Sequence, residues 1–183
     1  LEGLLQMRGT SSCFFQTPKT YARMALFSIP VWLFYEICNL RLKNWEYWDL
    51  PSLMGIRWLG YALAYATVLP ALLQTALVIK TLLPLSPMRQ SYKQLPGRVK
   101  TISCILGSLC LVWPFLWPQW YFPLIWAPAF LFLEPWLVHH SPKTSWLNDL
   151  FQRDYQNFYS LLLSGFCCGL LWESLNFWAG AKW

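Results

Sequence analysis

Residues 165–183 read GFCCGLLWESLNFWAGAKW, an apolar segment that carries a carboxylate, Glu173, and an amide, Asn176. In a helix, residues three apart lie on one face, so these two polar side chains lie together. Gly165 and Gly169 come eight and four residues before Glu173 and share that face. Two glycines at this spacing are typical of close packing between membrane helices. An ionisable residue in such a helix usually faces protein or water, so we expect this face to contact another helix.

The composition predicts an all-α integral membrane protein. Of 183 residues, 56% are hydrophobic and only 12% are charged, whereas a soluble domain carries roughly 25% charged residues. A membrane-spanning helix needs about 20 apolar residues. The chain offers five such runs, which we place at residues 22–40, 56–82, 101–116, 120–138 and 158–180. We expect one five-helix bundle that forms a single polytopic membrane domain over residues 1–183.

Prolines inside these runs predict bent helices. Pro30 lies in the first run and Pro70 in the second, and each should kink its helix. The fourth run contains Pro123, Pro128 and Pro135, so we expect it to be broken or strongly bent. The polar connection after the first run is rich in aromatic residues, as is typical of the membrane–water interface, where Trp and Tyr gather.

The basic residues predict the orientation. With five spans, ten of the 14 Lys and Arg residues fall on the side of the N-terminus, and Arg41, Lys43, Arg57 and Lys182 fall on the other. Cytoplasmic loops carry the excess of positive charge, so we expect a cytoplasmic N-terminus and an outer C-terminus. The predicted location is a cell membrane, of the bacterial inner-membrane kind, and the charge of +6 suits anionic lipid headgroups rather than nucleic acid.

The first and fifth runs resemble each other, which predicts an internal repeat. One reads FYEICNLRLKNW and the other LWESLNFWAGAKW, each with Glu, then Asn three residues later, then Lys and Trp. The fourth run reads APAFLFLE, similar to IPVWLFYE in the first. Repeats in membrane proteins often flank a binding site near the middle of the bilayer. The alternative is chance similarity between segments rich in Trp and Leu.

Two Glu and Asn pairs form the candidate site. Under the predicted topology the first and fifth runs point the same way, so Glu36 and Glu173 lie at similar depth, with Asn39 and Asn176 beside them. Glu134, in the fourth run, is a further candidate ligand and lies nearer the cytoplasm. Such a cluster can hold a cation, a proton or a polar headgroup. The alternative is hydrogen bonding between helices, worth about 0.6 kcal/mol per contact.

Other chemistries fit the sequence less well. A ferritin-like metal site needs Glu-x-x-His, but Asn takes the place of His in both pairs. His139 and His140 are adjacent, so they point about 100° apart on a helix and suit one ion poorly. The acidic residues of NDLFQRD have the wrong spacing for a diphosphate site, and no catalytic triad, HExxH or phosphate loop is present. The sequence therefore predicts no metal site and identifies no cofactor.

The expected function is that of a membrane-embedded binding or transport-type protein. It would hold a small polar or cationic group, or a lipid headgroup, at the Glu and Asn cluster. One alternative is an integral membrane enzyme that acts on a lipid or isoprenoid, with Glu36 or Glu173 as general acid or base. Another is a non-catalytic subunit of a larger membrane complex, joined to a partner helix through Gly165 and Gly169. The remaining predicted partner is the lipid bilayer.

Overall fold

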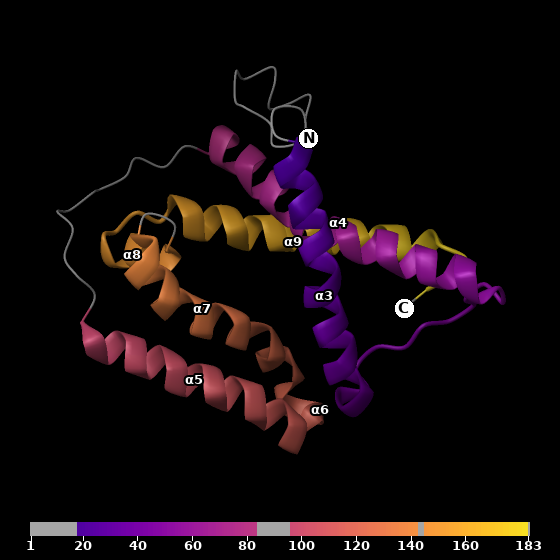
Figure 1. Cartoon of the computed structure of the whole chain (residues 1–183), viewed down its shortest axis with the longest axis horizontal. Helices are drawn as coiled ribbons and strands as arrows, with labels where there is room; N and C mark the ends of the chain where they lie inside the picture. Colours follow the sequence, from indigo (N-terminus) through magenta and orange to yellow (C-terminus); the bar gives the residue numbers. More distant parts are fainter. Residues whose placement is uncertain (1–17, 84–95, 143–144, 183) are drawn as a thin grey trace. The chain divides into compact units, whose positions relative to one another are not determined.

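The computed structural model describes residues 18–83, 96–142 and 145–182, and these residues are almost entirely helical (Figure 1). The elements are α3 (Pro18–Leu42), α4 (Met54–Leu82), α5 (Gly97–Leu116), α6 (Pro118–Tyr121), the 3₁₀ helix η1 (Phe122–Trp126), α7 (Ala127–His140), α8 (Trp146–Phe151) and α9 (Gln156–Trp178). The part of the chain described contains no β-strand, and an isolated antiparallel bridge joins Trp48 to Lys182.

The five predicted apolar helices are confirmed. Within the described residues, five helical segments are long and apolar enough to cross a membrane, namely α3, α4, α5, residues 118–140 and α9. The fourth is broken as predicted, because η1 separates α6 from α7 in the stretch that carries Pro123. A proline supplies no backbone N–H, so an α-helix is interrupted where several prolines follow one another.

The chain divides into two compact units. Unit 1 holds residues 18–38, 45–83 and 159–182, and therefore most of α3, all of α4 and most of α9. Unit 2 holds residues 39–44 and 96–158, apart from the two at 143–144, and therefore the end of α3 with α5, α6, η1, α7 and α8. The prediction of a single domain over residues 1–183 stays a prediction.

A buried serine joins α3 to α4 in unit 1. The Ser28 hydroxyl donates to the carbonyl of Tyr65 over 2.5 Å and accepts from the amide of Leu69 over 3.1 Å. It is thus inserted into the backbone ladder of α4, one residue before the buried Pro70. Serine side chains commonly satisfy backbone groups near prolines in membrane helices, and this contact fixes where the two helices cross.

The third helix of unit 1 is attached to α4 in the same way. The buried Ser164 of α9 donates to the carbonyl of Leu72 over 2.5 Å. One turn further along, the Cys168 thiol lies 3.5 Å from the Thr75 hydroxyl. Small polar side chains therefore contribute hydrogen-bonding contacts between α9 and α4.

In unit 2, α5 and α7 lie side by side (Figure 1). A Cβ atom added to the buried Gly107 would stand 3.1 Å from the Cβ of Leu131 and from the ring of Phe132. One turn earlier, Ser103 donates to the carbonyl of Leu131 over 2.7 Å. Pro135 cannot donate to that carbonyl four residues before it, so Ser103 replaces the missing bond. Small residues at this spacing permit the close approach.

The close contact predicted for Gly165 and Gly169 is not made within the described chain. A Cβ atom added at either position meets nothing within 4 Å, and Glu173 on the same face is exposed. The reason is that α9 packs on α4 through a different face, the one that carries Ser164 and Cys168. A partner helix from another molecule on the glycine face stays a prediction.

The distribution of exposed residues is the reverse of that in a water-soluble protein. Many large apolar side chains of the long helices are exposed, among them Leu26, Phe27, Phe166 and Leu170. Several serines are buried instead, including those at the helix contacts described above. Soluble monomers rarely expose contiguous apolar surface of this extent, and the pattern is consistent with helices that face lipid.

Candidate functional site

The carboxylate of Glu36, close to the end of α3, accepts hydrogen bonds from three aromatic side chains. The indole N–H of Trp32 lies 3.0 Å from Oε1, and that of Trp45 lies 3.3 Å from Oε1 and 3.4 Å from Oε2. The Tyr47 hydroxyl donates to Oε1 over 2.5 Å. Trp32 is one helical turn before Glu36, so its position follows directly from the helix. The other two donors come from the connection that follows α3.

A tight turn brings that connection back to Glu36. Lys43 has a φ of 50°, in the left-handed region, and its amide donates to the carbonyl of Asn39 over 2.8 Å. The next amide, that of Asn44, donates to the side-chain Oδ1 of Asn39, also over 2.8 Å. An Asn side chain that bonds to the backbone beyond it in this way stabilises a turn. Asn39 therefore shapes the segment that delivers Trp45 and Tyr47.

A pair of backbone hydrogen bonds holds the other end of the segment that follows α3. The amide and carbonyl of Trp48 pair with the carbonyl and amide of Lys182, over 2.7 Å and 3.0 Å. Trp48 directly follows Tyr47, and Lys182 follows α9. The segment that carries two of the three donors is thus tied to the chain at both of its ends.

Tyrosines from α4 extend the site beyond the carboxylate. The hydroxyls of Tyr47 and Tyr65 are 3.3 Å apart. The ring of Tyr61 lies 5.4 Å from that of Tyr47 and stacks on that of Tyr65 at 5.8 Å. Burial, followed by the hydrogen bond to Glu36, raises the pKa of the Tyr47 phenol. Tyr47 therefore stays protonated at neutral pH and remains a hydrogen-bond donor.

The negative charge at this site has no positive partner within the described residues. Its three hydrogen-bond donors are neutral side chains, and no described Lys, Arg or His forms an ion pair with Glu36. The rings of Trp32 and Tyr65, 6.0 Å apart, supply aromatic surface beside it. A carboxylate next to aromatic rings can attract a cation both by charge and by the ring quadrupole.

The other residues of the predicted cluster have different surroundings. Asn176 is buried on α9, and its backbone carbonyl accepts a hydrogen bond from the backbone amide of Ala179 over 3.1 Å. Glu173 is exposed, and no hydrogen bond joins it to Glu36 within the described residues. Three aromatic donors, rather than a second carboxylate, thus satisfy Glu36. A ligand shared by Glu36 and Glu173 stays a prediction.

Glu134 lies in unit 2 and is buried there. Its Oε2 accepts from the Ser145 hydroxyl over 2.7 Å and from the amide of Leu147 over 3.1 Å. The same Ser145 hydroxyl accepts from the amide of Asn148 and so caps the first turn of α8. Both groups bound by Glu134 belong to this helix start, where a negative charge is favourable. The geometry is that of a structural cap.

No group of three or more His, Cys, Asp and Glu side chains within the described residues could hold a metal ion. His139 and His140 are both exposed at the end of α7. The ring of His140 stacks on Trp136 at 4.5 Å, and its Nδ1 lies 3.0 Å from the Trp136 carbonyl. The two rings of the pair are at 84° to each other, which agrees with their divergent directions on a helix.

The sequence analysis did not identify the aromatic donors as part of the site. The aromatic residues of the connection, which include Trp45 and Tyr47, were predicted only to lie at the membrane–water interface. One signal was available, because Trp32 precedes Glu36 by four residues and an indole N–H is always a donor. The sequence does not predict that the segment after α3 folds back toward Glu36, because this depends on the left-handed turn at Lys43.

Comparison with protein-family models, curated proteins and solved structures returned no match. The chemistry of the site is therefore the basis for a function.

Proposed function

We propose that this chain is a membrane-embedded binding protein whose site is Glu36 with Trp32, Trp45 and Tyr47, and that its ligand carries an organic ammonium group. The observation that carries the proposal is the uncompensated carboxylate, which is bound only by neutral aromatic donors. A carboxylate kept partly out of water without a counter-charge is costly, and a cationic ligand would offset that cost.

The aromatic surroundings favour an ammonium over an inorganic ion. Small metal cations require several oxygen ligands, whereas the groups around Glu36 are indole and phenol rings. Quaternary and primary ammonium groups bind well where a carboxylate and π faces meet. Amine-bearing lipid headgroups and small organic cations both belong to this class. We infer that the donors hold the carboxylate in position while its remaining lone pairs face the ligand.

Calorimetric titration of the purified chain in detergent with tetramethylammonium and with an alkylammonium tests the proposal. The change Glu36→Gln keeps the volume and removes the charge, so it should weaken binding at least about tenfold, which is about 1.4 kcal/mol. Tyr47→Phe keeps the ring and removes one donor, so it should weaken binding less. Thermal unfolding of each variant should stay close to that of the unchanged protein.

Glu46→Gln is the matched control, since Glu46 is exposed and adjacent to Tyr47. It removes an equal charge from the connection beside the site without changing a residue of the site, and it should bind as the unchanged protein does. Equal binding by Glu36→Gln and Glu46→Gln would exclude Glu36 as the ligand group. Absence of binding by the unchanged protein would exclude the ammonium class.

We also propose that the long helices span a membrane with the N-terminus on the cytoplasmic side. The ten-to-four division of basic residues and the exposed apolar surface support this orientation. Glu36 lies at the end of α3 away from the N-terminus, so the site should open to the outer side. In sealed vesicles of known orientation, a membrane-impermeant quaternary ammonium should bind only from that side.

A second candidate function is that of a subunit in a larger membrane complex. The exposed Glu173 on the open glycine face of α9 favours it, because a carboxylate that faces lipid is costly. A partner helix would remove that cost. Loss of association in Gly165→Leu and Gly169→Leu, measured by cross-linking in the native membrane, tests this function.

A further inference from the structure

Unit 2 contains a cavity of about 350 Å³ at the end of α3, distinct from the Glu36 site. It is lined by Arg41, Leu42, Lys43, Asn44, Pro118, Gln119 and Phe122. Both walls, the α3 end and the α6–η1 segment, belong to this unit. Small-molecule sites begin at about this volume, and the lining combines two cations and two amides with an apolar side.

The two cations of the cavity differ from the others predicted on the same side of the membrane. The Arg57 guanidinium donates to the Pro51 carbonyl over 2.9 Å and 3.2 Å, and the Lys182 ammonium donates to the Phe177 carbonyl over 3.0 Å. Neither Arg41 nor Lys43 forms an ion pair within the described residues, and no carboxylate lines the cavity. The positive charges of Arg41 and Lys43 therefore lie together at the cavity, and no described carboxylate pairs with either of them.

The backbone holds this basic wall in a defined shape. Lys43 occupies the left-handed turn, with a φ of 50°, that Asn39 stabilises through its own carbonyl and its side-chain oxygen. Arg41 is in the last turn of α3. Positive side chains at a helix C-terminus interact favourably with the helix dipole. The dipole favours the charges but does not neutralise them as an anion would.

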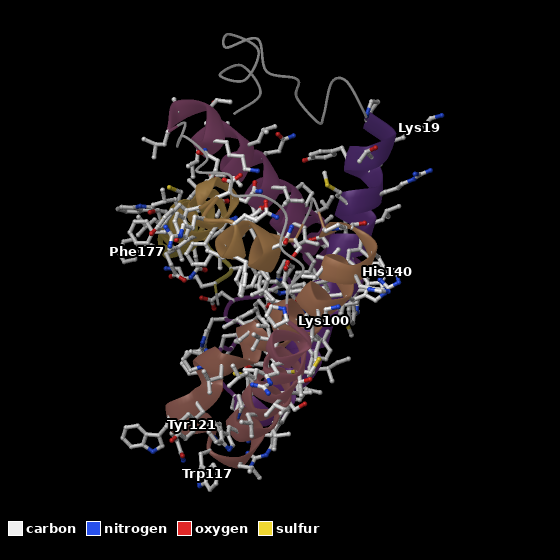
Figure 2. All side chains as sticks on the ribbon, turned by 90° about the vertical axis from the view of Figure 1, so that its left-hand side faces the viewer. Lys19, Lys100, Trp117, Tyr121, His140 and Phe177 are labelled. Carbon is white, nitrogen blue, oxygen red and sulfur yellow. The ribbon has the colours of Figure 1, made fainter. Side chains whose placement is uncertain are left out.

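The opposite wall lies in an aromatic segment typical of the membrane interface. The cavity residues Pro118, Gln119 and Phe122 lie in one short segment with Trp117, Trp120 and Tyr121. These three aromatic side chains are exposed. Figure 2 shows Trp117 and Tyr121 at the end of α5 and in α6, and their rings lie 6.4 Å apart. Exposed Trp and Tyr rings gather at the depth of lipid headgroups.

We propose that this cavity binds a phosphate group, at the depth where phospholipid headgroups lie. The planar guanidinium of Arg41 can hold two phosphate oxygens at once, and Lys43 adds a point charge. The amides of Asn44 and Gln119 can donate to further oxygens. Leu42, Pro118 and Phe122 form the apolar part of the lining and suit the carbon atoms of a phosphate ester. The site is independent of Glu36 and of its proposed ligand.

Two probes distinguish the sources of the phosphate. The full chain in detergent is titrated with inorganic phosphate by calorimetry and with short-chain phosphatidylglycerol by native mass spectrometry. Arg41→Gln combined with Lys43→Gln should weaken binding at least about tenfold, as expected when a charge-assisted bidentate contact is removed. Arg41→Lys keeps the charge and loses the bidentate contact, so it should weaken binding by a smaller factor. It is the test variant if the double variant does not fold.

Arg57→Gln is the matched control, because it removes one cation from the same predicted side and leaves the cavity intact. Binding of both probes supports a site for phosphate in general, and binding of the lipid alone supports a headgroup site. The proposal is overturned if neither probe binds, or if Arg57→Gln weakens binding as much as the double variant. Unchanged binding by Arg41→Lys would overturn the bidentate contact.

Discussion

Glu134 in unit 2 and Glu36 in unit 1 are both acidic residues on apolar helices, yet they are satisfied by different kinds of donor. Glu134 is buried and accepts from the Ser145 hydroxyl and the Leu147 amide at the start of α8. Glu36 is half-buried and accepts only from the side chains of Trp and Tyr residues. A carboxylate that caps a helix start is part of the fold. One that is held by aromatic side chains at a partly open position can still receive a ligand.

Gly107 of unit 2 and the glycine pair of α9 in unit 1 also differ in their surroundings. Gly107 of unit 2 lies against Leu131 and Phe132, where an added Cβ atom would be only 3.1 Å from each. Gly165 and Gly169 of unit 1 have open space where a side chain would begin. Unit 2 therefore uses its small residue for internal packing, whereas unit 1 presents its glycine pair on an exposed surface. The same spacing of small residues therefore permits close helix packing only where a neighbouring helix lies against it.

The largest expected effect is at Gly107. Gly107→Leu would place a side chain where even a Cβ atom is 3.1 Å from Leu131, so it should destabilise the protein by about 3 kcal/mol. Thermal or denaturant unfolding in detergent measures the loss. Gly165→Leu is the matched control and should unfold almost as the unchanged protein does. Equal losses at the two positions would contradict the packing difference between the units.

The next effect concerns the buried carboxylate of unit 2. Glu134→Ala would leave the buried Ser145 hydroxyl and the Leu147 amide without their acceptor, at a cost of about 2–3 kcal/mol. Glu36→Ala should cost about 1 kcal/mol, since its donors are only half-buried and can reach other partners. Unfolding in detergent measures both. A greater loss for Glu36→Ala would mean that the aromatic donors serve stability rather than binding.

The smallest effect on the isolated chain is expected on the open face of α9. Gly165→Leu and Gly169→Leu should change the unfolding free energy by no more than about 0.5 kcal/mol. If a partner helix covers this face, both variants should lose association, as measured by cross-linking in the native membrane. Leu171→Ala, at an exposed position on the opposite side of the same helix, is a size-changing control. Unchanged association in both glycine variants would reject this face as the contact with a partner.

Much of the helical framework was predictable because it depends on local properties. A run of apolar residues with few charges predicts its own helix, and the cluster of prolines after Trp117 predicts the break between α6 and α7. The contacts between helices were harder to predict. Ser103 and Gly107 have the same four-residue spacing as Gly165 and Gly169, yet only the former pair lies against a neighbouring helix. Spacing identifies a permissive face and does not identify its partner.

The candidate site was likewise predictable only in part. Glu36 was identifiable from the sequence, because a carboxylate inside an apolar segment must find polar partners or water whatever the fold. Its partners were not, since Trp45 and Tyr47 return to it only through the turn at Lys43 and the bridge between Trp48 and Lys182. The sequence by itself determined which segments are apolar helices and which of their residues are costly to leave unsatisfied. Only the tertiary structure decided what satisfies each one, because hydrogen bonds between distant segments depend on how the chain turns.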